Sequence, residues 1–222
     1  RKYNKLLEGI FYGVEFVDES NRVWCAHMGG INLFDPLMQQ FRNESFANLL
    51  SRGKWAFSFD MAYDSAANVI VSCPRFGEGL YFYHRDTRKW TMAPFKPDQE
   101  DFSLTVRGFA REKEGVYNIA ADEGLYRYTV KTKHLEPFPL NIPIVHHRYG
   151  PLLWDRKGRL WLCADIDGLI CWDPKTNGYK VFKKELGLEK PGSQLFSLNG
   201  IFEDSRNNIW VRMLGGYSVY ID

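Results

Sequence analysis

The chain has 222 residues, and its 29 Lys and Arg against 27 Asp and Glu give a formal net charge of +2. This near-neutral balance gives no support for nucleic-acid binding, which a basic face or stripe favours. Apolar residues make up 45% and aromatic residues 16% of the chain. This composition excludes intrinsic disorder and is typical of a strand-rich globular fold.

A motif recurs along the chain. Its three clearest copies consist of an Asp, a turn with Asn or Gly at the fourth position, an aliphatic residue and a Trp, and they run from Asp18 to Trp24, from Asp155 to Trp161 and from Asp204 to Trp210. Two weaker copies run from Asp64 to Ile70 and from Arg111 to Tyr117. The anchors at positions 24, 70, 117, 161 and 210 are therefore separated by 46, 47, 44 and 49 residues.

Each copy predicts four short antiparallel strands, A to D in chain order, because strand-length apolar segments alternate with Gly, Asn and Asp turns. Strand A is expected at residues 11–17, 55–63, 104–109, 149–154 and 196–202. Strand B carries the anchor and is expected at residues 23–26, 68–72, 116–120, 159–163 and 208–212. Strand C follows a Gly, at Gly30, Gly79, Gly124, Gly168 and Gly216. Four strands per ~40–50 residues are typical of β-propeller blades.

The predicted fold class is all-β, a β-propeller of four-stranded antiparallel blades with five repeats. The repeats lie at about residues 8–50, 51–98, 99–143, 144–192 and 193–222 plus 1–7. Two arrangements stay open. Residues 1–7 could supply the strand D that the fifth copy lacks, which would give a closed five-blade ring with a mixed blade and no open sheet edge. Alternatively, residues 1–222 are a fragment of a larger propeller.

The repeated positions predict packing rather than chemistry. We expect the anchors to form an inter-blade core and not sugar-stacking platforms, and we expect the leading Asp residues to cap their own turns and not to bind a metal. The four Cys predict buried thiols, with a bridge between Cys163 and Cys171 left open. Catalytic signatures are absent, and Glu15 and Asp60 are the only acids on the predicted strands A. We therefore predict no catalytic residue, no metal site and no cofactor.

The B–C loops and D–A connections differ from copy to copy, and variable loops on a rigid repeat are where recognition usually occurs. The loop of the second copy is longer than that of the first and is expected to bulge out. It combines a guanidinium, an aromatic ring and a carboxylate, which together can grip a sugar. The predicted ligand-binding residues are His27, Trp55, Arg75, Phe76, Glu78, Asp122, Asp165, Asp167 and Arg212.

The motif, followed by a Gly turn and an aromatic-Asp-Pro segment, resembles the two-component regulator propeller repeat. The best copies run from Asp155 to Pro174 and from Asp18 to Pro36. In that family the repeats form the extracytoplasmic sensor region of hybrid histidine kinases, often tuned to oligosaccharides.

The resemblance implies a periplasmic or extracytoplasmic sensing or interaction module without catalysis of its own, carried by a membrane-anchored parent protein. The implied partners are a small-molecule ligand such as an oligosaccharide, neighbouring propeller or sensor domains of the parent, and a second copy in a homodimer. No apolar run approaches the ~20 residues that span a bilayer, so we expect no membrane segment in this fragment. The alternatives are a propeller enzyme, either a lyase or a hydrolase, and a lectin-like sugar-binding protein.

Overall fold

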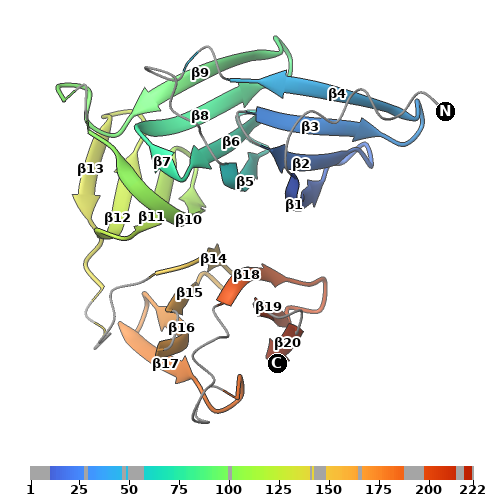
Figure 1. The fold of residues 1–222 in the computed structure, drawn as a ribbon. Helices are drawn as coiled ribbons and strands as arrows, with labels where there is room; N and C mark the ends of the chain where they lie inside the picture. Colours follow the sequence, from blue (N-terminus) through green and yellow to red (C-terminus); the bar gives the residue numbers. More distant parts are fainter. Residues whose placement is uncertain are drawn as a thin grey trace. The chain divides into compact units, whose positions relative to one another are not determined.

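The structure is a computed structural model that describes residues 11–27, 30–46, 49, 58–99, 102–140, 142, 149–164, 167–187, 198–213 and 218–221, with the side chains of residues 11–15, 27, 58–60 and 199 left aside. The described residues form strands β1 to β20 and no α-helix (Figure 1). The chain divides into two compact units, Arg1–Val106 and Arg107–Asp222. The all-β prediction is confirmed.

The first unit contains two antiparallel sheets, each of four strands, which we call blades 1 and 2. Blade 1 comprises β1 (Phe11–Val17), β2 (Val23–His27), β3 (Gly30–Asp35) and β4 (Gln40–Ser45). Blade 2 comprises β5 (Ser58–Asp64), β6 (Val69–Pro74), β8 (Gly79–His84) and β9 (Lys89–Pro94). The two-residue strand β7 (Phe76–Gly77) lies in the chain between β6 and β8.

The second unit contains blades 3 to 5. Blade 3 comprises β10 (Leu104–Lys113), whose first residues still belong to the first unit, β11 (Val116–Ala121), β12 (Gly124–Thr129) and β13 (His134–Pro137). Blade 4 comprises β14 (Leu152–Trp154), β15 (Leu160–Ala164), β16 (Gly168–Asp173) and β17 (Gly178–Phe182). Blade 5 has three strands among the described residues, β18 (Leu198–Glu203), β19 (Ile209–Met213) and β20 (Ser218–Ile221).

These sheets are β-propeller blades, as predicted, and each strand B begins within one residue of its predicted start. Strand A of blade 4 is shorter than expected, since β14 begins at Leu152 rather than at Tyr149. The mixed blade with residues 1–7 lies outside the described residues, so the choice between a ring and a larger propeller stays a prediction.

The pairing register corrects the anchor of blade 2. In blade 1 the residue opposite Trp24 is Phe16, and in blade 2 the equivalent Ala62 pairs with Val71, not with Ile70. The cause is the turn between β5 and β6, which is one residue longer. Its left-handed residue, Asn68, lies four positions after Asp64, whereas in the other motif turns that residue lies three positions after the Asp.

The anchor of blade 3 is also shifted by one position. The left-handed Gly115 precedes Asn118 by three residues, just as Gly158 precedes Trp161. Asn118 therefore takes the Trp position, and Glu112 takes the position of the leading Asp in place of Arg111. Tyr117 is buried as predicted, but it faces the other side of the sheet from the motif Trp and packs 6.2 Å from the Phe109 ring.

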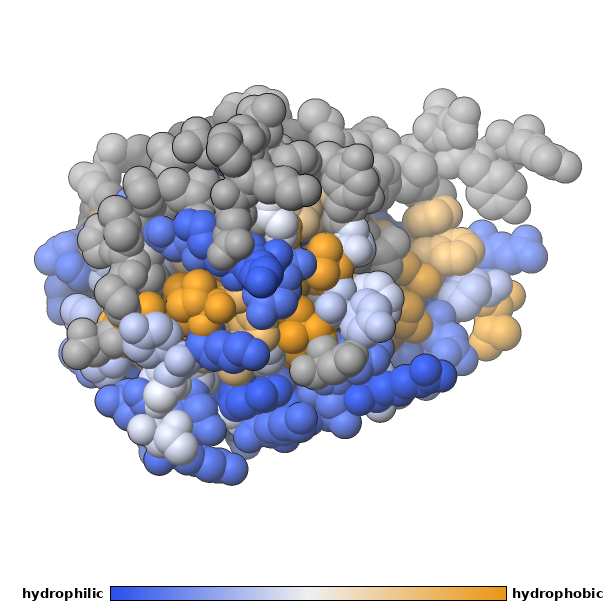
Figure 2. Space-filling view, turned by 90° about the horizontal axis from the view of Figure 1, so that it is seen from below, coloured by the Kyte–Doolittle hydropathy of each residue, from blue (hydrophilic) through white to orange (hydrophobic). Residues whose placement is uncertain are grey.

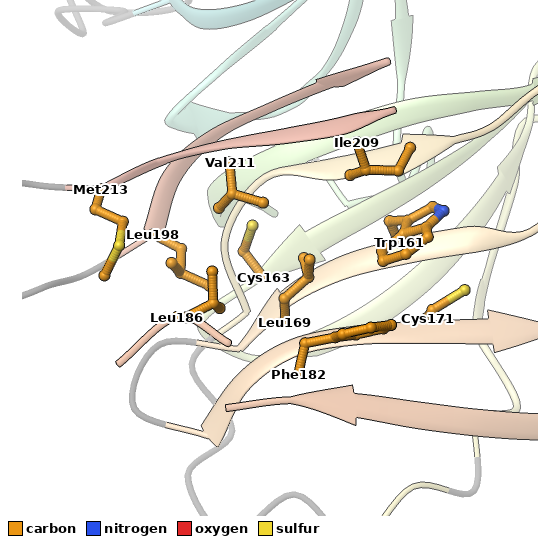
Figure 3. Packing of buried hydrophobic residues seen from close by; sticks show 10 residues of the cluster. All are labelled: Trp161, Cys163, Leu169, Cys171, Phe182, Leu186, Leu198, Ile209, Val211 and Met213. Carbon is orange, nitrogen blue, oxygen red and sulfur yellow. The ribbon is translucent and has the colours of Figure 1, made fainter. Parts of the chain in front are cut away.

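The cores lie between adjacent blades, where the facing sides of neighbouring sheets bury apolar residues. Between blades 1 and 2, Trp24 packs with Ile70 and Tyr83. Between blades 4 and 5, Trp161 and Phe182 stack at 5.4 Å and face Ile209 and Val211 of β19 (Figure 3). The prediction that the anchors serve inter-blade packing is confirmed for Trp24 and Trp161.

The four cysteines are free thiols. The bridge left open between Cys163 and Cys171 does not form, because Cys163 pairs with Leu169 while Cys171 pairs with Trp161, two register positions away. Cys163 is fully buried, and Cys171 is buried in the same core. Burial raises the pKa of the Cys171 thiol to about 11, which keeps it protonated and inert.

The structure explains why a Gly is needed at position 168, at the start of strand C in blade 4. Gly168 opens β16 at a φ of +100°, and a Cβ at this position would lie 2.8 Å from the Phe182 carbonyl oxygen. The residue is therefore required both by its backbone conformation and by the close approach of strand D. In the part of the chain that the structure describes, no helix has the length and apolar character needed to cross a membrane.

Candidate functional site

The A–B turns are held by their own Asp, as predicted. The Asp18 carboxylate accepts hydrogen bonds from the backbone N–H groups of Ser20 and Arg22, each at 3.0 Å. It also accepts the indole N–H of Trp24 at 2.9 Å, a contact that the sequence analysis did not foresee. Trp161 donates to Asp155 at 2.8 Å and Trp210 donates to Asp204 at 2.9 Å. We call this arrangement of Asp, turn and Trp the clasp.

The clasp keeps its carboxylates ionised. Burial alone would raise the pKa of Asp18, but hydrogen bonds from Trp24 and Arg22 outweigh it and the pKa is lowered. In blade 5, the Trp210 hydrogen bond is the main cause that lowers the pKa of Asp204 to about 2. A carboxylate with its oxygens so occupied is a structural group, and these Asp residues are not arranged as free metal ligands.

Cations on the turns join neighbouring blades. Arg85, in the turn after β8, places its guanidinium 3.2 Å from the Asp18 carboxylate and 2.8 Å from that of Glu19, so blade 2 is tied to blade 1. In the second unit, the Arg156 guanidinium donates to the backbone carbonyl of Asp204 at 2.8 Å and ties blade 4 to blade 5. These side chains at the A–B end of the blades therefore serve assembly, and the candidate ligand-binding side chains lie at the B–C ends.

The β6–β8 loop, Arg75–Glu78, was predicted to bulge out. In the structure its backbone is instead paired with a neighbouring strand. Its β7 strand pairs with the start of β10, with Gly77 opposite Leu104 and Phe76 opposite Thr105. The backbone N–H of Val106 donates to the Arg75 carbonyl at 2.6 Å. The extra residues form a short strand because they meet the chain that leads into the next blade. Backbone pairing thus ties the loop to the start of β10.

The side chains of this loop still present a binding chemistry. Phe76 keeps 46% of its surface exposed, and the Arg75 guanidinium lies 5.7 Å from the centre of its ring. Glu78 is half-buried, and the burial of Tyr81, with a smaller contribution from the negative charge of Glu78, raises the pKa of the Tyr81 hydroxyl. An exposed ring beside a guanidinium can stack on an apolar face while the cation binds hydroxyl or carboxylate oxygens.

The candidates in the second unit differ in their surroundings, and Asp122 is engaged by a cation. Arg107, on β10, donates to both carboxylate oxygens of Asp122, at 2.6 and 2.9 Å. Arg212 packs across Gly200, where a Cβ would lie 3.3 Å from its Nε. Asp167 is half-buried and directly precedes β16. A ligand that used Asp122 would therefore have to compete with Arg107.

Arg107 is the residue that the sequence analysis missed. It lies on a predicted strand A, where only acids were counted, and its pairing with the B–C turn could have been inferred from the antiparallel A–B pairing. Trp55 and Asp165 lie outside the described residues, as does the side chain of His27. Within the described part of the chain, no group of three or more His, Cys, Asp or Glu side chains could hold a metal ion.

The surface hydropathy does not single out a site. On the face drawn in Figure 2, the described hydrophobic residues lie in patches among hydrophilic ones. Such a mixture is ordinary for a protein surface. The candidate ligand-binding loop is therefore identified by its side-chain chemistry and not by surface hydropathy.

No family model and no curated protein sequence matches the chain. Among solved structures, the extracellular domain of a protein described as a hybrid two-component system from Bacteroides thetaiotaomicron matches with a TM-score of 0.66 and 14% identity, over 100% of this chain and 35% of that one. A second domain of the same description and organism matches with a TM-score of 0.65 and 15% identity, over 95% of this chain and 26% of that one.

A catalytically inactive virginiamycin B lyase from Staphylococcus aureus matches with a TM-score of 0.66 and 12% identity, over 96% of this chain and 70% of that one. At these identities the similarity shows the fold, which a sensor and an enzyme share. The chain spans about a third or less of the length of the two extracellular domains.

Proposed function

We propose that this chain is an extracytoplasmic ligand-sensing or interaction module of a two-component signalling system, without catalysis of its own. The observation that carries the proposal is the repeated Asp-turn-Trp motif, which resembles the two-component regulator propeller repeat. All five copies fit the period, and two depart from the motif, with Ile70 in place of Trp in the second and Arg111 in place of Asp in the third. The structural similarity to extracellular domains of two-component systems supports the same class. The periplasm is the proposed compartment.

We propose a saccharide as the ligand and the β6–β8 loop as its principal contact. The support is chemical: Phe76 offers a half-exposed ring, and Arg75 offers a guanidinium beside it. Because the backbone of this loop is already paired, the loop loses less conformational entropy when a ligand binds. For signalling, the ligand must favour one arrangement of domains or subunits over another, because equal affinity for both shifts no equilibrium.

The second candidate function is a propeller lyase or hydrolase, which the similarity to a virginiamycin B lyase favours. The two functions differ in one measurable way, since an enzyme converts the compound that it binds. Substrate turnover, and not binding, therefore separates them.

The test is a panel of oligosaccharides, screened by calorimetry for binding and by chromatography for conversion, with and without divalent metal ions. The proposed function predicts binding of at least one oligosaccharide with complete recovery of the unaltered compound. Conversion of a bound compound, abolished by a substitution in the chain, would replace the sensor by the enzyme. Binding of none would refute saccharide sensing.

A further inference from the structure

The turn that joins β3 to β4 differs in chemistry from the other described turns between strands C and D (Figure 1). In each of these turns the residue directly before strand D has a left-handed φ between 50° and 56°, so the turns share one backbone form. The two residues before it form the apex. The apex is apolar in blade 1 and polar in blades 2 to 4. Its residues are Leu37 and Met38 in blade 1, Asp86 and Thr87 in blade 2, Lys131 and Thr132 in blade 3, and Lys175 and Thr176 in blade 4.

The side chains of the blade 1 apex lie open to solvent. Leu37 is 87% exposed and Met38 is 63% exposed, the highest values among the large hydrophobic residues in the described part of the chain. The turn itself does not require them, because the same backbone form carries Lys175 and Thr176 in blade 4. Single exposed apolar residues are ordinary, but two adjacent ones at the apex of a turn indicate contact with an apolar partner.

The backbone of this apex is held by the residue that precedes it. The Asp35 carboxylate accepts hydrogen bonds from the backbone N–H groups of Leu37 and Met38, each at 3.0 Å. Pro36 has no N–H group. From Pro36 to Met38, the apex therefore carries no unpaired N–H group into an apolar environment, where such a group is costly.

The chemistry of the apex favours a lipid bilayer over a protein surface. Two side chains cover far less than the ~800 Å² that each partner contributes to a standard protein interface. They also lack the Trp, Tyr and Arg side chains that dominate protein–protein binding. Fluid acyl chains, by contrast, accept aliphatic side chains without a complementary pocket. The exposed Gln39 and Gln40 that follow are uncharged and can hydrogen-bond in the headgroup region.

We propose that Leu37 and Met38 form a membrane-contact site that inserts into the surface of a phospholipid bilayer. The contact is weak and reversible on its own, because even a single lipid chain gives only marginal membrane binding. It would therefore act together with another attachment of the parent protein to the membrane and turn this end of blade 1 toward the bilayer. The site is separate from the β6–β8 loop, so the proposal does not depend on saccharide sensing.

The test is partitioning of the purified chain onto vesicles at millimolar lipid, made of phosphatidylcholine alone or with phosphatidylglycerol. The variant Leu37→Lys with Met38→Thr gives the turn the apex of blade 4, so its melting temperature should be unchanged. We expect its partition constant to be at least about tenfold lower, as for the loss of one buried Leu or Met side chain. The control Val181→Thr, at a position that is 41% exposed on β17, should partition like the wild type.

Oxidation of Met38 by hydrogen peroxide, followed by peptide mass spectrometry, reports whether the apex is covered. At a lipid concentration that binds most of the chain, we expect phosphatidylcholine vesicles to slow sulfoxide formation at Met38 severalfold. Free methionine in the same solution serves as the reference and should be oxidised at an unchanged rate.

Equal partitioning of the wild type and the apex variant, including no binding of either, would overturn the proposal. Binding that requires phosphatidylglycerol and leaves Met38 unprotected would also overturn it, since charge would then account for the binding. Protection of Met38 without lipid, only at high protein concentration, would assign the apex to a second copy of the chain instead.

Discussion

Two kinds of blade occur in this chain, those with a clasp and those without. In blades 1, 4 and 5 the leading Asp holds its own turn and receives the indole N–H of the Trp six residues later. In blade 2, Asp64 accepts the backbone N–H groups of Ala66 and Ala67 in a turn one residue longer, and Val71 stands where the Trp would be. Blade 2 thus keeps the turn cap and lacks the hydrogen bond from a Trp to the Asp.

Blade 3 replaces the link instead of losing it. Glu112 stands in the position of the Asp, and its carboxylate accepts hydrogen bonds from Nε and Nη2 of Arg127 at 2.9 and 3.1 Å. Asn118, in the position of the Trp, accepts the indole N–H of Trp154 from blade 4 at 2.7 Å. In blade 4, the Trp161 indole N–H binds Asp155 within the same blade. At the equivalent position of blade 3, Asn118 instead forms a hydrogen bond with the neighbouring blade.

The comparison shows that the sheet geometry is fixed by register and turn length, while the polar contacts around it are exchangeable. In blades 1, 4 and 5 the Asp of the turn accepts the indole N–H of the motif Trp. In blade 3, where both residues differ, Glu112 accepts from Arg127 and Asn118 accepts from Trp154. Four predictions follow from this difference in order of decreasing effect.

Trp161→Ala should cause the largest loss of stability. Removal of a buried Trp costs ~3–5 kcal/mol, and here it also removes the stacking on Phe182 and the donor to Asp155. Unfolding in denaturant measures the loss. The control is Lys175→Ala, at an exposed turn position, which should change the free energy of unfolding by less than ~0.5 kcal/mol. Similar midpoints for both variants would show that Trp161 is not core.

The clasp should appear as coupling between its two residues. In a double-mutant cycle of Asp155→Ala and Trp161→Phe, we expect a coupling energy of ~1–3 kcal/mol, because either change leaves a buried partner without its hydrogen bond. The matched cycle in blade 2 pairs Asp64→Ala with Val71→Ala and should give less than ~0.5 kcal/mol. Equal coupling in both blades would remove the distinction between them.

In blade 3, Asn118→Ala should destabilise by ~1–2 kcal/mol, since the Trp154 indole N–H loses its acceptor. Trp154→Phe in the Asn118→Ala background should then cost less than it does alone. Thermal unfolding of the two single variants and the double variant measures this difference. Strict additivity would show that the bond between blades contributes nothing.

The smallest effect concerns acid. The hydrogen bond from Trp210 lowers the pKa of Asp204 from 3.8 to about 2. Because the folded-state pKa is depressed, the stabilisation is fully present above pH ~4 and is lost as the pH falls through about 2. The difference in stability between the wild type and Trp210→Phe should therefore be constant above pH ~4 and shrink below it. A difference that is the same at pH 6 and at pH 2 would contradict this account.

The fold was predictable because turn residues and aromatic residues recur at a regular spacing, and each blade needs them for its own turns and packing. The anchors of blades 2 and 3 were misplaced by one residue. In blade 2, Val69 and Val71 flank the expected Ile70, so only the register distinguishes the two faces. In blade 3, the equivalent position is occupied by the polar Asn118, and the neighbouring Tyr117 was taken for the anchor. The capping role of Asp18, Asp155 and Asp204 was predictable from local turn chemistry. The hydrogen bonds from the Trp indole N–H groups to these carboxylates were not predictable, because they depend on how each Trp side chain lies across the sheet.

The candidate loops were less predictable. The extra residues of the second copy predicted a protruding loop, but pairing with a strand 27 positions away, between Gly77 and Leu104, fixes it. Likewise, the antiparallel A–B pairing brings Arg107 near the turn that holds Asp122, but it does not indicate that the two side chains form a bidentate ion pair. Non-local contacts of this kind follow from the assembled sheets, which a local pattern does not describe.

The central claim is that repeated positions hold the blades while the β6–β8 loop recognises the ligand. Calorimetry with an oligosaccharide that binds the wild type tests it most directly, on Phe76→Ala, Arg75→Ala and the control Tyr179→Ala, whose exposed ring matches Phe76 at 44% against 46%. We predict weaker binding for Phe76→Ala and Arg75→Ala, with nearly unchanged melting temperatures, and wild-type affinity for Tyr179→Ala. Wild-type affinity in both loop variants would contradict the claim.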